Sequence, residues 1–258
     1  MAFGRPDVCR LMRILARCVA AAVAFSVLQV LAVRFVDPPI TMTMIGQIWA
    51  VQAEGGGLHW VAYRHRSLDE LGPAVARAAV SAEDARFFLH RGFDWEAVCS
   101  AMDAYDPDAK RMRGGSTITQ QVAKNVFLWQ ERSWLRKGLE AWYTVLLEAL
   151  VPKERILELY LNVAETGRLT FGFEAGADRY WKKPSAELTS AQAAQLAAIL
   201  PSPRKWSPGQ GVAARRADWI ARHPAPFPGD RGFDAQLEWY AGHARGPMAC
   251  FRADPGPK

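Results

Sequence analysis

The sequence predicts a mainly α-helical protein with one N-terminal transmembrane helix. An apolar run follows an arginine-rich start, and apolar residues recur with helical spacing between Leu71 and Pro201. The alternation typical of β-strands is scarce. The chain has 258 residues, 50% of them hydrophobic. It is long enough for one domain of about 200 residues and an additional segment.

The N-terminal segment has the composition of a membrane anchor. Four arginines precede an apolar run at residues 18–33, and the apolar character continues past Arg34 to Val36. As a helix the run rises only about 24 Å, short of the ~30 Å hydrocarbon core, but flanking arginines can extend their charged ends to the interface. We therefore predict a cytoplasmic N-terminus at residues 1–17, from the positive-inside rule, and a transmembrane anchor at residues 18–36.

A cleaved signal peptide is the alternative for this segment. Residues 30–32 (Val-Leu-Ala) form an acceptable cleavage site, but the apolar core of a signal peptide is usually shorter than this run. The anchor is the favoured interpretation, and it puts the remainder of the chain outside the plasma membrane.

A linker is expected after the anchor, at residues 37–57. Pro38 and Pro39 end the anchor, and a Glu-Gly-Gly-Gly run marks a flexible loop, so the segment is predicted to be irregular. The portion around Ile45 is apolar enough to lie against the membrane.

Helix boundaries in the following region carry sequence signals. Pro73 suits a first helical position, and residues 117–120 and 189–192 both have the Thr-x-x-Gln spacing of a capping box. Pro201 ends the last of these helices. The segments at residues 136–150 and 153–163 each have one apolar face, the second formed by Ile156, Leu159, Tyr160 and Val163.

The tail at residues 207–258 is rich in Gly, Pro, Arg and Asp. We expect loops and one helix near residues 235–243, with no assigned role. The four cysteines have no metal-binding spacing, so free thiols are expected and a disulfide between Cys99 and Cys250 is left open.

The net charge of +6 indicates an anionic partner, which could be nucleic acid, a membrane surface or a phosphorylated substrate. Nucleic acid is excluded, because the arginines concentrate at the membrane end and the remainder of the chain is expected to be exported.

Four polar runs are candidates for chemistry: EDARFFLHRGFD (83–94), GGSTITQQVAKN (114–125), RKGLE (136–140) and KERILELYLN (153–162). The first is either a tight corner or a carboxylate placed for catalysis. The second leads into a helix N-terminus, which suits an anion, but it lacks the spacing of a phosphate-binding P-loop. Taken alone, the third is an ordinary helical ion pair worth under about 0.5 kcal/mol, and the fourth is structural.

Together and in this order, the four runs resemble the signature motifs of the peptidoglycan glycosyltransferases, glycosyltransferase family 51. Residues 171–203 resemble the last family region, and the resemblance spans residues 58–206. It implies a lysozyme-like helical glycosyltransferase domain over those residues. The short chain and single anchor resemble the monofunctional biosynthetic transglycosylases. One departure is Trp181-Lys182-Lys183, where an aromatic residue, Gly and Lys are more usual, so the shape of that loop is open.

The resemblance implies polymerisation of lipid II into β-1,4-linked glycan strands, with release of undecaprenyl diphosphate, in cell-wall biosynthesis. Glu83 matches the general base that takes the proton of the acceptor hydroxyl. Glu140 matches a second essential glutamate near the leaving pyrophosphate. The implied substrate-binding residues are Ser116, Thr117, Gln121, Lys124, Asn125, Arg136 and Lys137. The implied supporting residues are Asp84, Phe87, His90, Arg155, Glu158 and Asn162.

The same resemblance implies the surroundings of the enzyme. No metal ligands and no required cofactor are expected, although Mg²⁺ or Mn²⁺ stimulates some members. The expected partners are lipid II, the growing lipid-linked glycan, the membrane, and other cell-wall synthesis or division proteins. The expected location is the inner (plasma) membrane, crossed once, with the catalytic domain on the periplasmic side.

Two alternative functions are considered. A lysozyme-like lytic enzyme cleaves peptidoglycan and needs a general acid for a sugar leaving group, whereas the basic residues Lys124, Arg136 and Lys137 favour a pyrophosphate. A non-catalytic scaffold that binds lipid II is less favoured, because Glu83 and Glu140 are both present.

Overall fold

The computed structural model describes residues 5–55, 57, 59–103, 115–131 and 133–244. Helices account for most of these residues, so the predicted mainly helical class is confirmed. The helices are α1 (Arg5–Phe35), α2 (Met42–Ala53), α3 (Leu68–Leu71), α4 (Pro73–Glu83), α5 (Trp95–Asp103), α6 (Ile118–Phe127), α7 (Trp134–Leu150), α8 (Lys153–Val163), α9 (Phe173–Trp181), η1 (Ser185–Glu187), α10 (Ser190–Ala198), α11 (Gly211–Arg222) and α12 (Phe233–His243).

A small sheet accompanies the helices. Its strands are β1 (Ala62–Tyr63), β2 (Glu165–Gly167) and β3 (Thr170–Phe171), in the order β1-β3-β2. β1 runs parallel to β3, and β2 runs antiparallel to it. The strands are only two or three residues long. This explains why no alternating pattern was visible in the sequence.

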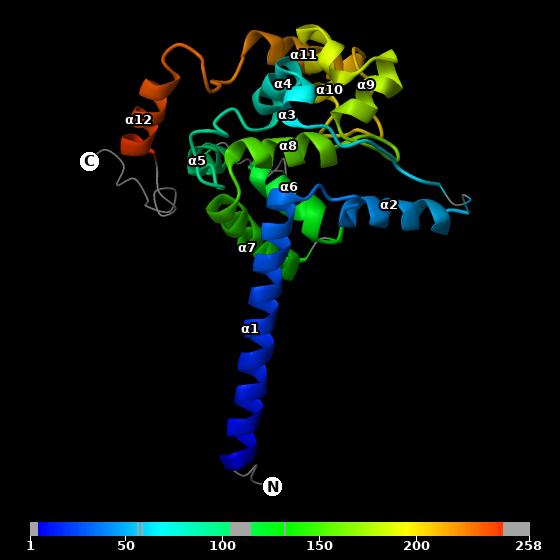
Figure 1. The fold of residues 1–258 in the computed structure, drawn as a ribbon. Helices are drawn as coiled ribbons and strands as arrows, with labels where there is room; N and C mark the ends of the chain where they lie inside the picture. The colour runs from blue at the N-terminus through cyan, green and yellow to red at the C-terminus, as the bar shows by residue number, and fades with distance from the viewer. Residues whose placement is uncertain (1–4, 56, 58, 104–114, 132, 245–258) are drawn as a thin grey trace.

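The helices form a domain from which α1 projects (Figure 1). α3, α4, α9, α10 and α11 gather at the end remote from α1, and α6 and α7 lie at the near end with α8 between the two groups. α4 packs against α10 and α11, and α6 packs against α7 and α8. The predicted buried face of α8 is confirmed, since Ile156, Leu159, Tyr160 and Val163 are all inaccessible to solvent.

Local signals placed several helix boundaries correctly. Pro73 starts α4. Both predicted capping boxes are present, that of Thr117 at the start of α6 and that of Thr189 at the start of α10. Each uses the threonine hydroxyl and the glutamine side chain to satisfy backbone N–H groups that have no partner within the helix.

The N-terminal helix is long and apolar enough to cross a membrane from Cys9 to Phe35. Within the described part of the chain, its last turns contact the domain, where Val30 and Val33 are buried in the core. Two side chains of α7 hold it there: Trp142 Nε1 donates to Ser26 Oγ (3.0 Å) and Tyr143 Oη donates to Gln29 Oε1 (2.6 Å). Part of the apolar face predicted for residues 136–150 therefore receives the anchor, while Tyr143 also stacks on Phe127 of α6.

The linker prediction was wrong in one respect. Residues 37–57 include the helix α2, whose N-cap Thr41 accepts a hydrogen bond from the backbone N–H of Met44. The sequence hid this helix because its buried face mixes the polar Thr43 and Gln47 with Met44 and Val51, so no purely apolar stripe marks it.

The tail contains more structure than the sequence indicated. The helix expected near residues 235–243 is confirmed as α12, but α11 was not expected. Its buried face is made of Ala213, Ala217 and Ile220, which pack on α10 and α4. Small alanines between arginines give a weak hydrophobic pattern, which is why this segment was interpreted as a loop.

The state of three cysteines can be stated. Cys99 takes part in a disulfide while Cys9 and Cys18 are free, so the expectation of free thiols was wrong for Cys99; Cys250 lies outside the described residues.

Lys182, where glycine is more usual, adopts the left-handed conformation with φ of 56° and caps α9. The loop thus keeps the backbone conformation that a glycine would adopt there.

Candidate active site

A cleft of about 1280 Å³ opens between α4, α6, α7 and α11. Its walls include residues of the first, second and third motifs together with residues from the tail. Glu83 and Gln121 lie beside Lys137, Lys205 and Arg216. The volume is above that of a typical small-molecule pocket, and four of the five charged residues that line it are basic, so the cleft suits a large anionic substrate.

Glu83 is the last residue of α4 and lines this cleft. Its carboxylate accepts hydrogen bonds from Gln121 Nε2 (3.0 Å) and from the Arg216 guanidinium (2.9 Å). Burial raises the pKa of Glu83 above its ordinary value, even though Gln121, Arg216 and Lys124 act to lower it. A carboxylate with a raised pKa that remains accessible from a cleft is suited to accept a proton.

The remainder of the first motif fixes the position of Glu83. Asp84 is buried, and its carboxylate accepts from the backbone N–H of Ile118 (2.9 Å) and bonds to His90 Nε2 (2.9 Å). Phe87 is fully buried beneath this corner. These contacts tie the end of α4 to the start of α6, so the supporting residues Asp84, Phe87 and His90 lie where they orient both elements.

Glu140 lies on α7 and is also buried, with 4% of its side chain exposed. It pairs with Arg136 (3.2 Å) and Lys137 (2.5 Å) of the preceding turn. The sequence motif alone suggested an ordinary surface ion pair. The structure instead puts the carboxylate inside the protein, where an ion pair is weakly screened and removal of one partner is costly.

Lys124, on α6, connects the two glutamates electrostatically. Burial lowers the pKa of Lys124, Glu140 and Glu83 act to raise it, and Arg136 and Lys137 act to lower it further. These four motif side chains therefore all act electrostatically on one ammonium group. Within the described residues, that ammonium group makes no hydrogen bond or ion pair, so its charge is free for a ligand.

A second, smaller cavity of about 140 Å³ continues from the cleft beyond Gln121. Lys124, Asn125 and Thr43 line it. The buried hydroxyl of Tyr160 lines it as well and has no hydrogen-bond partner in the described part of the chain. An unpaired buried hydroxyl beside a free ammonium favours a polar ligand.

Ser116 and Thr117, also predicted to bind the substrate, have different surroundings. Ser116 is exposed and lines the main cleft. Thr117 is buried and lines neither cavity, because its hydroxyl donates to Gly92 O (2.7 Å) and caps α6. The structure thus gives Thr117 a structural position, whereas Ser116 faces the cleft.

The fourth motif serves the junction between anchor and domain. Arg155 pairs with Asp37 (2.8 Å), just after the anchor, and with Glu158, and it donates to Val33 O (3.0 Å). Glu158 also accepts from the backbone N–H of Leu68 (2.7 Å). Asn162 bonds to both backbone groups of Arg66. None of these three supporting residues lines either cavity.

The sequence analysis missed the contribution of the tail to the cleft. Arg215 and Arg216 of α11, with Lys205 and Trp206, line one wall. The available signal was the Ala-Ala-Arg-Arg-Ala pattern, whose alanines mark a helix face that packs closely and whose arginines lie beside it. Without the fold, nothing linked this pattern to Glu83.

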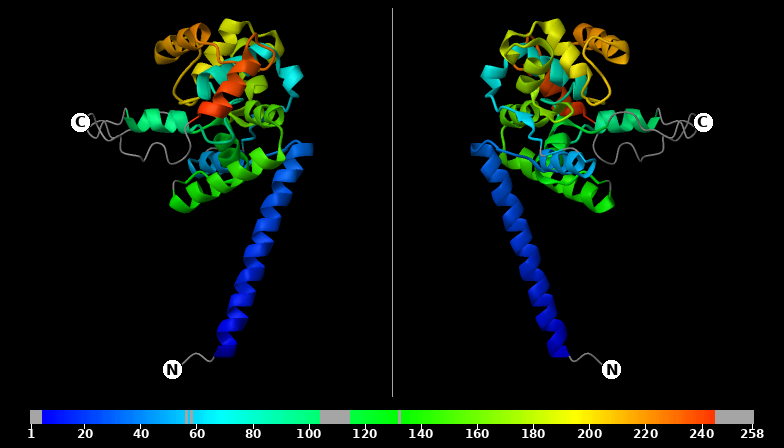
Figure 2. Two further views of the ribbon diagram at one scale, coloured as in Figure 1. Left: turned by 90° about the vertical axis from the view of Figure 1, so that its left-hand side faces the viewer. Right: turned by 90° about the vertical axis from the view of Figure 1, so that its right-hand side faces the viewer.

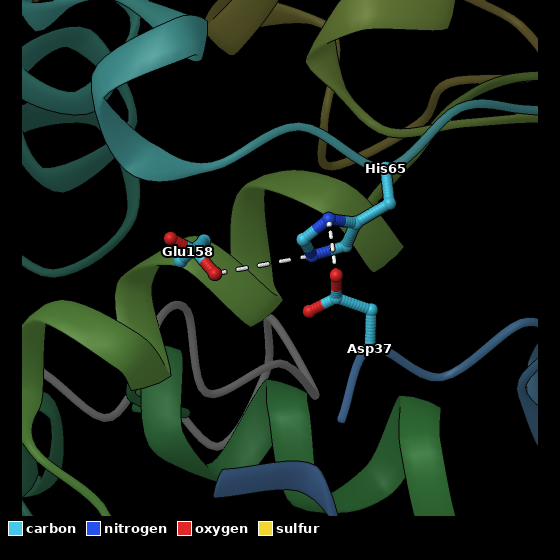
Figure 3. A group of neighbouring side chains, drawn as sticks. All are labelled: Asp37, His65 and Glu158. Carbon is cyan, nitrogen blue, oxygen red and sulfur yellow. Dashed lines mark ion pairs between the residues drawn. The ribbon is translucent and has the colours of Figure 1, made fainter. Parts of the chain in front are cut away.

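Two groups of side chains among the described residues lie close enough together to hold a metal ion. Figure 3 shows one of them, in which Asp37 pairs with Nδ1 of His65 (3.1 Å) and Glu158 lies 3.9 Å from Nε2. A second group, Asp84, His90 and Asp94, is already paired internally and with Arg86. Glu83 in the cleft and the buried Glu140 are each bound to cationic side chains.

Comparisons with known proteins identify the family of the chain. The family model described as Transglycosylase matches residues 54–224. The chain is 50% identical over 202 residues to the biosynthetic peptidoglycan transglycosylase of Xanthomonas campestris pv. campestris (strain B100), covering 77% of this chain and 81% of that protein. It is 46% identical to the protein of that name from Xylella fastidiosa (81% and 86% covered) and 50% identical to that from Caulobacter vibrioides (75% and 82% covered). With these matches over most of its length, the chain belongs to the transglycosylase family.

Proposed function

We propose that the protein is a peptidoglycan glycosyltransferase that polymerises lipid II into β-1,4-linked glycan strands and releases undecaprenyl diphosphate. Family membership and the names of the relatives support cell-wall glycan polymerisation. The observation that carries the finer proposal is the arrangement around Lys124, whose free ammonium is influenced by both Glu83 and Glu140.

Glu83 acts as the general base. An alcohol is a weak nucleophile until a carboxylate accepts its proton, and Glu83 reaches the cleft from a buried position with a raised pKa. Gln121 and Arg216 hold its carboxylate in one orientation. The acceptor sugar hydroxyl therefore attacks from the side of the cleft that Glu83 lines.

The basic residues stabilise the leaving group. A departing pyrophosphate develops negative charge on oxygen, which cations placed in advance stabilise without a proton transfer. Lys124, Arg136 and Lys137 supply those cations. Glu140 keeps Arg136 and Lys137 in place through its two ion pairs, so its role is to position charge rather than to donate a proton.

We propose that α1 is a retained single-pass anchor, with residues 1–17 in the cytoplasm and the catalytic domain on the periplasmic side. Cleavage after Ala32 would remove Val30, which is fully buried, and the hydrogen-bond partners Ser26 and Gln29. A signal peptide that leaves the mature protein has no reason to complete its core, so this packing supports an anchor.

A lytic enzyme and a non-catalytic scaffold are the competing functions. A lytic enzyme releases a neutral sugar and needs no cations at its leaving group, whereas Glu140 holds Arg136 and Lys137 in place and all three act electrostatically on Lys124. A scaffold has no need of a buried, raised-pKa carboxylate at the cleft. Both competitors are excluded by the same assay if long glycan forms.

The test is polymerisation of labelled lipid II by the full chain in detergent, with Mg²⁺ present, beside the Glu83→Gln variant. We expect wild-type polymer that lysozyme digests, and a rate lower by about 10³-fold in the variant, within the range for loss of a general base. Asp234→Asn on α12, outside the cleft, is the control for a single surface charge. If a folded wild type binds lipid II and forms no polymer, the scaffold function replaces the enzyme.

A further inference from the structure

Helix α2 exposes an apolar face, unlike an ordinary surface helix. Against the domain it buries the polar Thr43 and Gln47, one turn apart, beside Met44 and Val51. On the opposite face it exposes Met42 and Trp49, the latter with 68% of its surface accessible. Surface helices of proteins in water normally bury the apolar face and expose the polar one.

The polar face of α2 is satisfied by specific hydrogen bonds. Gln130 Nε2 donates to Thr43 Oγ1 (2.6 Å), and Thr43 lies 3.4 Å from Asn125 Oδ1. The backbone N–H of Leu169 donates to Gln47 Oε1 (3.2 Å). These contacts fix which side of α2 faces the domain, so the exposure of Trp49 is a consequence of the packing and not of a loosely placed helix.

The outer face of α2 is suited to lipid. No charged residue lies between Asp37 and Glu54, and Phe35, Val36 and Ile40 before the helix are exposed apolar residues as well. Tryptophan is the side chain most characteristic of the boundary between headgroups and acyl chains. A charge-free exposed face would be unfavourable in water but favourable at that boundary.

The position of α2 in the fold also favours contact with lipid. Figure 1 shows α2 at the end of the domain from which α1 projects, running across the direction of α1. Figure 2 shows α2 near the top of α1 in both side views. Only the segment from Val36 to Thr41 separates the two helices, which limits the distance between their ends to about 25 Å.

We propose that α2 lies in the interfacial layer of the bilayer that α1 crosses, with its Trp49 face toward the lipid. The inference rests on the proposed membrane anchoring. Because Thr43 and Asn125 line the small cavity beside Lys124, the helix seated on the membrane also forms part of the wall of the candidate active site. The cleft is thereby held at the level where a lipid-linked pyrophosphate leaves the bilayer.

The test measures membrane depth and does not depend on activity. The full chain carrying Trp49→Cys is spin-labelled, with the free cysteines Cys9 and Cys18 replaced by serine, and reconstituted in phosphatidylglycerol–phosphatidylethanolamine vesicles. Power saturation with oxygen and with a water-soluble nickel chelate reports depth. We expect greater oxygen than nickel accessibility at position 49, corresponding to about 5–10 Å below the headgroup surface.

Trp219→Cys is the matched control. Trp219 is also an exposed helical tryptophan, but it lies on α11 at the end remote from α1 (Figure 1), so its label should be accessible mainly to nickel. Ile45→Cys, one turn before Trp49, repeats the test if Trp49→Cys does not fold. Equal nickel accessibility at positions 49 and 219 would overturn the proposal, and so would exclusion of both reagents at position 49, because a protein partner would then cover the face. Loss of polymerisation with normal depth would contradict only the proposed function.

Discussion

The two glutamates of the candidate site obtain their surroundings in different ways. Glu140 is paired with residues three and four positions earlier on its own helix. Glu83 is held by Gln121 of α6 and Arg216 of α11, which are 38 and 133 residues away in the chain. The environment of Glu140 is therefore largely local, and that of Glu83 exists only when three separate helices have packed.

The difference has a chemical consequence. Local cations keep Glu140 paired, which suits a residue that positions positive charge. Burial raises the pKa of Glu83, and its distant partners Gln121 and Arg216 lower that pKa only in part. A base must release a proton between turnovers and accept one during attack, and a balance of burial and partial pairing achieves this.

The largest expected effect is a difference in stability between Glu140→Gln and Glu83→Gln. The comparison of the two glutamates predicts changes of opposite sign. Glu140→Gln leaves the largely buried Arg136 without a counter-charge, whereas Lys137, with 47% of its side chain exposed, is solvated, and we expect a loss of about 3 kcal/mol in unfolding free energy. Thermal unfolding of both variants across pH is the measurement.

Glu83→Gln should behave in the opposite way. Because the folded-state pKa of Glu83 is raised, its contribution to stability is full below the unfolded-state pKa and is lost as pH rises through the folded-state pKa. Wild type should thus lose stability relative to Glu83→Gln as the pH increases above about 4.5. Equal losses in both variants at neutral pH would mean that the two carboxylates have equivalent environments.

Removal of the distant cation should change the pH dependence of the rate. Arg216 lowers the pKa of Glu83, so Arg216→Met raises it and moves the acid limb of kcat/KM to higher pH, with about a tenfold lower rate on that limb for one unit of movement. Arg216→Lys should keep most of the wild-type profile. The neighbouring Arg215→Met also removes a charge from the cleft wall and should leave the position of the limb unchanged.

The hydrogen bond between Tyr143 of α7 and Gln29 of α1 tests whether the end of the anchor is part of the folded domain. Tyr143→Phe removes the hydrogen bond to Gln29 of α1 and leaves the ring in place. We expect a loss of about 1 kcal/mol, seen as a lower Tm of the full chain in detergent. An unchanged Tm would indicate that the last turns of α1 do not contribute to the folded domain.

The smallest effect concerns a purely local feature. Lys182 adopts a left-handed conformation with φ of 56°, which a residue with a Cβ adopts at a cost. Lys182→Gly should therefore stabilise the protein by about 0.5–1 kcal/mol, with no change in polymerisation. Chemical denaturation measures the difference, and Lys183→Gly, the exposed neighbour, is the control that should show no gain.

By itself, the sequence determined whatever depends on residues close together in the chain. The capping boxes at Thr117 and Thr189, the buried face of α8, the apolar anchor and the pairing of Glu140 with its helix neighbours were all predictable, because each is a pattern within a few turns. The motif order also identified the family, since each long motif carries specific residues at fixed spacing.

Only the tertiary structure decided which side chains meet. α11 was hidden because alanines give little hydrophobic signal, and so its Arg216 could not be assigned to Glu83. The helix α2 was hidden because its buried face combines Thr43 and Gln47 with apolar residues, and a periodicity of apolar residues cannot reveal a face that packs partly through hydrogen bonds. Burial of Glu140, the raised pKa of Glu83 and the free charge of Lys124 likewise depend on distant segments excluding water, which no local pattern records.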